Sequence, residues 1–313
     1  MKIYNLGSLN IDYVYQVPHF VRPGETLSSR EMNTFPGGKG LNQSAALGKA
    51  GAEVIHCGLV CENDGWLIDV LRDANVDTAR IRTLSSPTGH AIIQVDQGGQ
   101  NCILLYPGTN HLFTPEYVEE VLADARPGDI VLLQNETNCL DVIFETAHAR
   151  GLQLAFNPSP FDKSLMNLPL SYVSWWILNE LEGGELTGRQ NPGEILDAMH
   201  ESYPKSNIVL TVGRNGSYFR NGTQRLHVPA VPVKAVDTTA AGDTFTGYFL
   251  AAIAQSAEIQ SALRRASLAA SIAVSRRGAA CSIPWSSELD AETLHLRLEM
   301  PPADTTGHLP TAK

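Results

Sequence analysis

The chain has 313 residues, of which 43% are hydrophobic, so it is long enough to bury the core of one large α/β domain or of two smaller ones. Its formal net charge of −10 at pH 7 gives no electrostatic support for a nucleic-acid partner. No stretch approaches the ~20 apolar residues of a transmembrane helix. Residues 1–12 read as a strand and lack the apolar core of a signal peptide. We therefore expect a cytoplasmic protein that binds neither nucleic acids nor membranes.

Apolar patterning predicts strands and helices that alternate along the chain. Short runs rich in branched and aromatic side chains predict strands over residues 3–17, 53–60, 129–134, 153–159, 173–179 and 207–213. Helical periodicity predicts helices over residues 41–51, 64–76, 114–125, 140–151, 192–203, 243–256 and 259–278. Asp64 is the expected N-cap of the second helix. A hairpin is predicted over residues 216–230.

This alternation, with helices of 10–15 residues, is typical of a mainly parallel, doubly wound sheet with helices on both faces. The hairpins expected near residues 12–36 and 89–106 do not fit the rhythm, and the second is joined through Gly98 and Gly99. We interpret them as a small accessory β-sheet, a lid beside the main domain. Residues 301–313 are expected to form a disordered tail.

Ligands of open α/β sheets bind beyond the carboxyl ends of the strands, so the loops there are the first candidates for a site. The segment FPGGKGLNQSAA, residues 35–46, places Gly37, Gly38 and Gly40 directly before a helix. It is not a Walker A motif, and no GxGxxG follows the first strand, so nucleotide binding by those two routes has no support. Glycines let backbone amides approach a ligand, and Asn42 can donate to and accept from a polyhydroxy ligand. A plain glycine-rich turn capped by polar residues is the alternative.

Acidic and amide side chains are also predicted at three other strand ends. Asn10 and Asp12 end the first strand two residues apart, and thus on one face, which suits a grip on vicinal hydroxyls. Glu136 follows a buried strand, as do Asn179 and Glu182. Carboxylates at this edge can ligate Mg²⁺ through water or accept a ligand hydroxyl. Ordinary turn residues or solvated helix starts are the alternative for each.

The strongest candidate is DTTAAGDTFTG, residues 237–247, at the start of a predicted helix. Ala240, Ala241 and Gly242 have no side chains to obstruct an anion, and the unpaired amides and dipole of a helix N-terminus favour negative charge. Asp243 beside such an anion makes sense if the anion is a phosphoryl group in transfer and the carboxylate accepts a proton from the attacking hydroxyl. An aspartate N-cap on a helix of small residues is the alternative.

These segments resemble the two signatures of the ribokinase family of sugar and nucleoside kinases, often called the PfkB family. GGKGLNQSAALGKAGAEV, residues 37–54, is similar to the N-terminal signature, and DTTAAGDTFTGYF, residues 237–249, to the C-terminal one. The other motifs follow in the family's order between residues 3 and 290. The resemblance implies a kinase domain over residues 1–300 whose β-sheet lid closes over the sugar and joins a homodimer.

The resemblance also implies roles for individual residues. Those that match the family's sugar-binding positions are Asn10, Asp12, Gly38, Lys39, Gly40, Asn42, Glu136 and Asp243. Those that match its nucleotide-binding positions are Asn179, Thr211, Val212, Gly213, Arg214, Asn215, Gly216 and Gly242. Mg²⁺ would lie near Glu182 through water. Those that match a site for an activating monovalent cation, K⁺, are Asp237, Thr239, Ala273, Arg276, Gly278 and Ser282, several through backbone carbonyls.

The implied activity is ATP-dependent phosphorylation of the primary hydroxyl of a sugar, ribose or a related furanose. We hypothesise that Asp243 takes the proton of that hydroxyl. The amides of Ala240, Ala241 and Gly242, together with Mg²⁺, would stabilise charge on the moving phosphoryl group. Lys39 has two interpretations, a contact with the sugar or phosphate and a solvated loop lysine.

Several departures from the family pattern concern the substrate. Thr239 stands where an apolar residue is usual and Leu41 where a small one is usual, and YPGTN, residues 106–110, differs from a HAGAN-like stretch. A nucleoside or another sugar or sugar acid therefore stays open as the substrate. From a different class, a catalytically silent sugar sensor is the further alternative. A Rossmann dehydrogenase is excluded because the glycine fingerprint is missing.

Overall fold

The computed structural model describes residues 1–289. The expected tail over residues 301–313 and the expected domain end at residue 300 lie outside the described part. Within residues 1–289, no helix combines the length and the apolar character that crossing a membrane requires.

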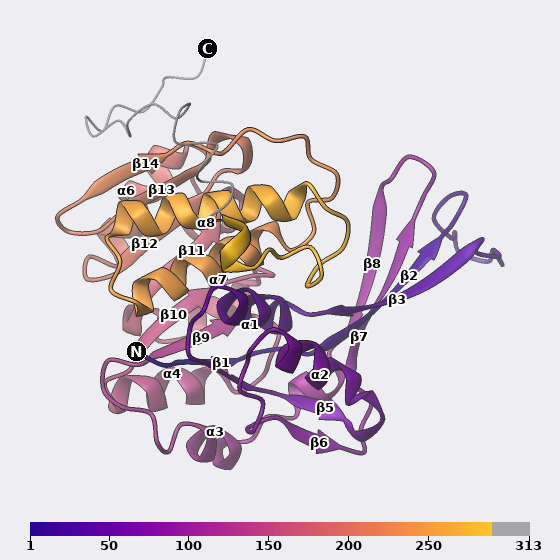
Figure 1. The fold of residues 1–313 in the computed structure, drawn as a ribbon, viewed down its shortest axis with the longest axis horizontal. Helices are drawn as coiled ribbons and strands as arrows, with labels where there is room; N and C mark the ends of the chain where they lie inside the picture. Colours follow the sequence, from indigo (N-terminus) through magenta and orange to yellow (C-terminus); the bar gives the residue numbers. More distant parts are fainter. Residues whose placement is uncertain (290–313) are drawn as a thin grey trace.

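An eight-stranded sheet forms the centre of the molecule, in the order β14-β13-β12-β11-β10-β9-β1-β4 (Figure 1). The strands from β12 to β4 are parallel, and β13 and β14 extend the sheet as an antiparallel hairpin. The parallel strands are β1 (Ile3–Leu6), β4 (Val54–Cys57), β9 (Ile130–Gln134), β10 (Gln153–Asn157), β11 (Val173–Asn179) and β12 (Asn207–Thr211). The hairpin strands are β13 (Ser217–Arg220) and β14 (Arg225–Val228). The predicted mainly parallel sheet is therefore confirmed.

Helices cover both faces of this sheet because its parallel strands bury side chains on both sides. In β1, Ile3 packs into one apolar cluster and Tyr4 into the other, as the two-residue period of a strand requires. One face is covered by α1 (Lys39–Lys49), α2 (Trp66–Asp73), α7 (Ala241–Ala254) and α8 (Ile259–Val274). The other is covered by α3 (Pro115–Val121), α4 (Leu140–Ala149), α5 (Glu180–Thr187) and α6 (Pro192–Ser202).

A second, four-stranded sheet projects from the body as a lid (Figure 1). Its strands, in the order β3-β2-β7-β8, are β2 (Asn10–Gln16), β3 (Glu31–Gly37), β7 (Gly89–Val95) and β8 (Asn101–Tyr106). β2 pairs with β7 in parallel, while the β2–β3 and β7–β8 pairs are antiparallel. The two segments that broke the βα rhythm of the sequence thus form one sheet, as predicted.

Asn10 and Asp12 do not end the first strand of the central sheet, as the sequence predicted. That strand stops at Leu6, and the chain turns at Gly7, where a Cβ would lie 2.6 Å from the Cα of Gly40. β2 then begins at Asn10 and pairs within the lid. Both side chains therefore belong to the lid, and the spacing of two residues keeps them on one face.

Two local predictions near the lid are wrong. The strand expected over residues 53–60 is divided at Gly58, and its second part pairs separately, as β5 (Leu59–Cys61) with β6 (Arg82–Leu84). Asp64 is not the N-cap of α2, because Gly65 holds that position. The carboxylate of Asp64 instead accepts the hydroxyl of Thr88 at 2.6 Å.

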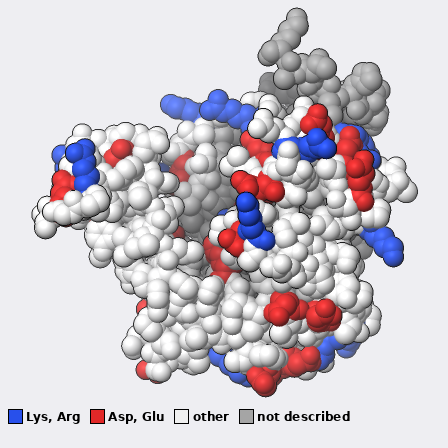
Figure 2. All heavy atoms as spheres, turned by 180° about the vertical axis from the view of Figure 1, so that it is seen from behind, with Lys and Arg blue, Asp and Glu red and all other residues white. Residues whose placement is uncertain are grey.

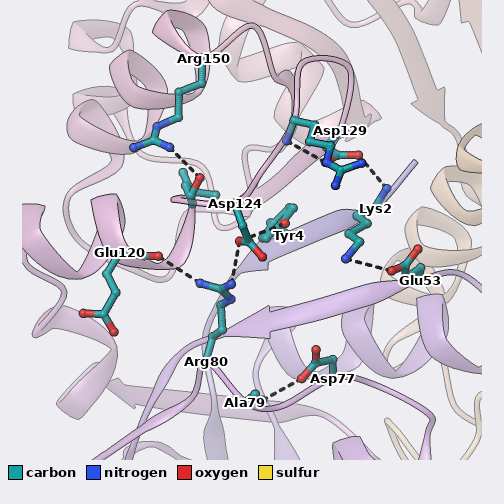
Figure 3. A network of polar contacts seen from close by, with 12 residues as sticks. Lys2, Tyr4, Glu53, Asp77, Ala79, Arg80, Glu120, Asp124, Asp129 and Arg150 are labelled. Atoms are coloured by element: carbon teal, nitrogen blue, oxygen red, sulfur yellow. Dashed lines mark hydrogen bonds and ion pairs between the residues drawn. The ribbon is translucent and has the colours of Figure 1, made fainter.

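Charged side chains near the amino ends of the strands pair with one another (Figure 3). The Nζ of Lys2 lies 3.1 Å from Oε1 of Glu53, and the Lys2 amide donates to Asp129 at 2.9 Å. An Nη2 of Arg80 lies 2.7 Å from Oδ1 of Asp124. Exposed pairs of this kind contribute about 0–1 kcal/mol each. None of the predicted site residues belongs to this network, which lies at the sheet edge opposite the strand carboxyl ends.

Candidate active site

A cleft lies over the carboxyl ends of β10, β11 and β12, where the loops after these strands meet the start of α7. It is lined by Asn157, Asn179 and Thr211, the last residues of the three strands. Lys39 and Glu182 reach it from the starts of α1 and α5. Figure 2 shows a recess between the lid and the body, with acidic side chains around it. This is the sheet edge at which open α/β folds bind their ligands.

The N-terminus of α7 opens into this cleft. Ala240 holds the N-cap position in the left-handed conformation (φ 58°), and no side chain of the described chain caps the helix. Ala240, Ala241 and Gly242 line the cleft, and a Cβ added at Gly242 would meet no described atom within 4 Å. The amide of Ala241 donates weakly to the carbonyl of Thr238, at 3.3 Å. The first amides of a helix have no partner within the helix itself, so this end still offers donors and positive potential to an anion.

Asp243 is buried beside these amides, with 7% of its surface exposed, and it lines the same cleft. Nδ2 of Asn42 donates to its Oδ2 at 3.0 Å, and Nε2 of Gln43 donates to its Oδ1 at 2.9 Å. The Oδ1 of Asn42 is buried without a hydrogen-bond partner among residues 1–289. An unmet acceptor is costly, so this oxygen suits a ligand that brings a hydroxyl.

The glycine loop before α1 folds against the turn between β1 and β2. Gly38 has φ 92°, which favours glycine, and a Cβ at Gly40 would lie 2.2 Å from the amide nitrogen of Ser8. The Ser8 hydroxyl donates to Oε2 of Glu136 at 2.5 Å and accepts from the amide of Gly40 at 3.1 Å. The amide of Lys39 donates to the same oxygen of Glu136 at 2.9 Å. Glu136 therefore holds the glycine loop in place.

The lid supplies Asn10 and Asp12. Nδ2 of Asn110 donates to Oδ1 of Asn10 at 2.7 Å, while Oδ1 of Asn110 accepts the amide of Leu9 at 2.9 Å. The oxygen of Asn10 thus already accepts one hydrogen bond, and its amide nitrogen can donate to a ligand. The carboxylate of Asp12 packs on Gly37, where a Cβ would lie 2.3 Å from either oxygen.

The charged groups of the site perturb one another. Burial raises the pKa of Asp12 to about 6, and repulsion from Glu136 adds to it. Burial also raises the pKa of Glu136, against the attraction of Lys39. Burial alone would lower the pKa of Lys39, but the negative charges of Asp243, Glu136 and Glu182 outweigh it and raise that pKa. A half-buried lysine among carboxylates is not a solvated loop lysine, and it gives this acidic chain a fixed positive charge in the cleft.

Asn179 and Glu182 form a capping box at the start of α5, the helix start that the sequence offered as the alternative interpretation of these residues. Oδ1 of Asn179 accepts the amides of Leu181 and Glu182 at 2.9 Å each. Oε2 of Glu182 accepts the amide of Asn179 at 3.0 Å. The cap uses one carboxylate oxygen of Glu182, so the other is not needed for the fold.

The predicted nucleotide-binding turn after β12 reaches the cleft through Thr211. The residues that follow in this turn do not line it: Val212, Gly213, Arg214, Asn215 and Gly216. Gly216 has φ 91°, and a Cβ there would lie 2.1 Å from the carbonyl oxygen of Val228. The turn therefore packs against the β13–β14 hairpin.

Asp237 joins the two segments that carry the predicted cation-site residues. Its Oδ1 accepts the amide and the hydroxyl of Thr239 at 2.9 and 2.6 Å, and its Oδ2 accepts the amide of Gly278 at 3.0 Å. Burial opposes the charge of Asp237, but these hydrogen bonds and nearby Arg277 hold the pKa of its carboxyl below the usual value.

The other predicted cation-site residues lie at or after the end of α8. The amide of Arg276 donates to the carbonyl of Ala273 at 3.1 Å, and its guanidinium pairs with Glu288 at 2.5 Å. Ser282 is buried, and its hydroxyl donates to the carbonyl of Ala279 at 2.9 Å. Among residues 1–289, no three His, Cys, Asp or Glu side chains form a cluster that could hold a metal ion.

Sequence reasoning missed Ser8, Gln43 and Asn110, whose side chains bond to the side chains of the predicted sugar-binding residues Glu136, Asp243 and Asn10. Each lies within or beside a motif that drew attention for another residue. Gln43 follows Asn42 in the glycine-loop signature, and Asn110 ends the YPGTN stretch. A buried polar residue next to a ligand-binding candidate was the available signal.

The helix amides, the buried aspartate and the lysine of this cleft are groups that suit a phosphoryl anion at the edge of a doubly wound sheet. The profile described as "pfkB family carbohydrate kinase" matches residues 2–286. The chain therefore belongs to the pfkB family of carbohydrate kinases.

Individual relatives cover nearly the whole chain. The ribokinase of Staphylococcus aureus strain COL is 35% identical in an alignment 301 residues long, which covers 92% of this chain and 98% of that protein. The structure of ribokinase from Cryptococcus neoformans var. grubii serotype A in complex with ADP has a TM-score of 0.84 and 30% identity, covering 93% of this chain and 99% of that one. The Arabidopsis thaliana ribokinase complexed with ribose and ATP has a TM-score of 0.82 and 27% identity, covering 96% and 99%. The predicted family, fold class and enzyme class are confirmed.

We expect Asp12→Asn to stabilise the protein at neutral pH and not at acidic pH. The folded pKa of Asp12, about 6, lies above the unfolded value of ~3.9, so its contribution to stability falls as pH rises between them. Asparagine has no charge to bury. The unfolding free energy of the Asp12→Asn variant should exceed that of the wild type by on the order of 1 kcal/mol at pH 7.5, after allowance for solvent screening. At pH 4.5 the difference should be small.

Urea unfolding at both pH values measures this difference. Asp73→Asn, the same change on an exposed residue of α2, is the control and should show no such pH dependence. An equal gain for Asp12→Asn at both pH values would contradict the burial of its charge.

Proposed function

We propose that this enzyme phosphorylates the primary hydroxyl of ribose, or of a closely related furanose, with ATP as the phosphoryl donor. Relatives named ribokinase, one of them complexed with ribose and ATP, support this substrate pair. The observation that carries the proposal is the placement of Asp243 and the open amides of α7 in one cleft. ATP is a cytoplasmic metabolite, and we place the enzyme in that compartment.

In this proposal Asp243 orients the attacking hydroxyl and accepts its proton. Phosphoryl transfer passes through a loose transition state, so the proton leaves late and a carboxylate suffices as the acceptor. The amides of Ala240, Ala241 and Gly242 donate to the oxygens of the moving phosphoryl group, where negative charge gathers. Lys39 adds a fixed positive charge to the same cleft.

The two substrates would approach from opposite sides of Asp243. On the lid side, the Asn10 amide donates to sugar hydroxyls, while the Asp12 carboxylate and Oδ1 of Asn42 accept from them. On the body side, Asn179 and Thr211 line the part of the cleft assigned to the nucleotide. The glycine loop lies between the lid side and the body side, and its shape depends on Gly38, Gly40 and Glu136. The turn over residues 212–216 would contact the nucleotide from outside the cleft.

We also assign Mg²⁺ and K⁺ to this enzyme. Glu182 fits Mg²⁺ through water, because it lines the cleft and its helix cap uses one carboxylate oxygen. When bound, Mg²⁺ would neutralise charge on the phosphates. The segments around Asp237, Thr239 and Gly278 would supply the backbone carbonyls for a monovalent cation, and hydrogen bonds to the Asp237 carboxylate hold these segments together.

A substrate panel tests the activity. ATP consumption with pentoses, hexoses, keto-sugar acids and nucleosides should be fastest with ribose, and faster in K⁺ than in Na⁺. A clear preference for a nucleoside or for another sugar would replace ribose as the substrate. Equal rates in the two salts would contradict K⁺ as an activating cation. If no compound led to ATP consumption, a sugar sensor would be favoured over a kinase.

Asp243→Asn tests the base. We expect turnover to fall by about 10²–10⁴-fold, the usual range for a general acid or base, while the affinity for the sugar changes little. Asp141→Asn is the matched control, because Asp141 lies in the first turn of α4 and is exposed. Near-normal turnover of Asp243→Asn would rule out this aspartate as the base.

We further propose that two copies of the chain pair through the lid. β8 is one of the two edge strands of the lid, and four consecutive apolar side chains on it are exposed: Ile103, Leu104, Leu105 and Tyr106. Leu104 is 67% exposed. An outer strand with such side chains on both faces invites pairing, and exposed apolar patches mark interaction sites.

The wild type should therefore be a dimer by light scattering after size-exclusion chromatography, and Ile103→Lys/Leu104→Lys should be a monomer. Lysine places charge on both faces of the outer strand, which blocks pairing. Met166→Lys, at an apolar side chain that is 52% exposed away from the lid, is the control and should stay dimeric. A monomeric wild type, or a dimeric double variant, would exclude the lid as the interface.

A further inference from the structure

We propose that Gln43 is a positioning residue of this kinase and fixes the direction of the Asp243 carboxylate. The inference rests on the role proposed for Asp243. Gln43 lies on α1 with its side chain fully buried, and it does not line the cleft. It acts through the aspartate and not on a substrate.

The amide of Gln43 is held in one orientation. Its Nε2 donates to Oδ1 of Asp243 at 2.9 Å and to Oδ1 of Asn157 at 3.0 Å. Its Oε1 accepts from Nε2 of Gln134 at 2.8 Å. A flipped amide would turn its oxygen toward two other acceptor oxygens and its nitrogen toward a donor, so the flipped state is excluded.

The two neighbours of Gln43 are oriented in turn by the strands next to their own. Asn157 donates through Nδ2 to the carbonyl of Ile177 at 2.9 Å, which leaves its Oδ1 facing Gln43. Gln134 donates through Nε2 to Oδ1 of Asn5 at 3.0 Å as well, so its nitrogen is the atom turned toward the network. Asn5, Gln134 and Asn157 belong to β1, β9 and β10. Ile177 belongs to β11, so four neighbouring strands set the direction of the Gln43 amide.

Beyond Gln134, the hydrogen-bond network runs through Asn5 and Ser44 to His56, and these three residues are uncharged. Nδ2 of Asn5 donates to the carbonyl of Gly40 and to the hydroxyl of Ser44, both at 2.8 Å. The Ser44 hydroxyl bonds to Nδ1 of His56 at 2.8 Å. Burial lowers the pKa of His56 to about 3, so the ring is neutral at physiological pH. Asp243 is thus the charged member of this buried network.

The side-chain amides of Asn42 and Gln43 each bind one oxygen of the Asp243 carboxylate, and together they prevent it from rotating. The terminal torsion of an aspartate is broad, so an unanchored carboxylate turns easily. Asn42 supplies the other anchor, but its amide is also the one expected to meet the sugar. Gln43 is therefore the anchor that stays in place with or without substrate. A base must present its lone pair to the attacking hydroxyl, and misplacement by about 1 Å can cost 10²-fold in rate.

Gln43→Met tests this, because methionine has a similar length and cannot donate. We expect kcat with ribose to fall by about 10–10²-fold, while KM for ribose and for ATP stay within about 2-fold. Gln153→Met is the matched control. Gln153 lies at the amino end of β10, and its amide likewise links elements, donating to the Gly128 carbonyl at 3.1 Å and accepting from Trp175 at 2.8 Å. This variant should keep wild-type kcat.

Gln43→Glu supplies a readout that a purely structural role would not give. Glutamate keeps the size but can donate to Asp243 only when protonated, and the adjacent carboxylate favours its protonated form. The kcat of this variant relative to wild type should therefore rise as pH falls from 8 to 6. A pH-independent ratio, or a loss confined to KM or to thermal stability, would overturn the positioning role.

The outcomes for Gln43 and for the proposed function can be told apart. An inactive wild type would contradict the sugar-kinase proposal, whereas an active wild type with an equally active Gln43→Met would contradict the role of Gln43 alone. A crystal structure of Gln43→Met without substrate needs no activity. It should show the Asp243 carboxylate rotated or in two orientations, and an unchanged single orientation would overturn the inference.

Discussion

The close approach of α1 and α7 is the contact on which the site depends. A Cβ at Gly247 would lie 2.4 Å from the Cβ of Ala46, so the helices can meet at this distance only with a glycine there. At that distance two amides of α1 reach the Asp243 carboxylate across the interface. The small residues of the DTTAAGDTFTG segment therefore meet two separate demands. Gly242 leaves the helix amides open to a ligand, and Gly247 lets the helices touch.

Signals that are local in the sequence predicted the layers of the fold, whereas contacts between distant residues decided the errors. Period-two runs and helical periodicity gave the parallel sheet and both helix layers because each signal lies within one element. The first strand was predicted too long because its end depends on Gly7 packing against Gly40. Asp64 was misjudged as a cap because its partner, Thr88, lies 24 residues away.

The same division holds within the site. Asn42, Glu136 and Asp243 were predictable because each stands in a recognisable segment. Gln43 was not, since its meaning comes from a carboxylate 200 residues along the chain. The capping box of Asn179 and Glu182 has a local sequence signature, so a helix start was already the alternative interpretation of these two residues. A residue such as Gln43, which orients another polar side chain, has no recognisable sequence pattern. It can be identified only when the fold shows which residues it contacts.

The lid strand β2 carries Asn10 and Asp12 and is hydrogen-bonded to both β3 and β7. A movement of the lid therefore moves Asn10 and Asp12, the residues proposed to bind the sugar. A bound sugar would in turn favour one position of the lid over another. Recognition and closure are then one equilibrium, and a ligand shifts it by its difference in affinity for the two lid positions. If two lids form one interface, linkage extends this to the partner subunit, and sugar binding in one subunit alters affinity in the other. Cooperativity would need no separate regulatory site.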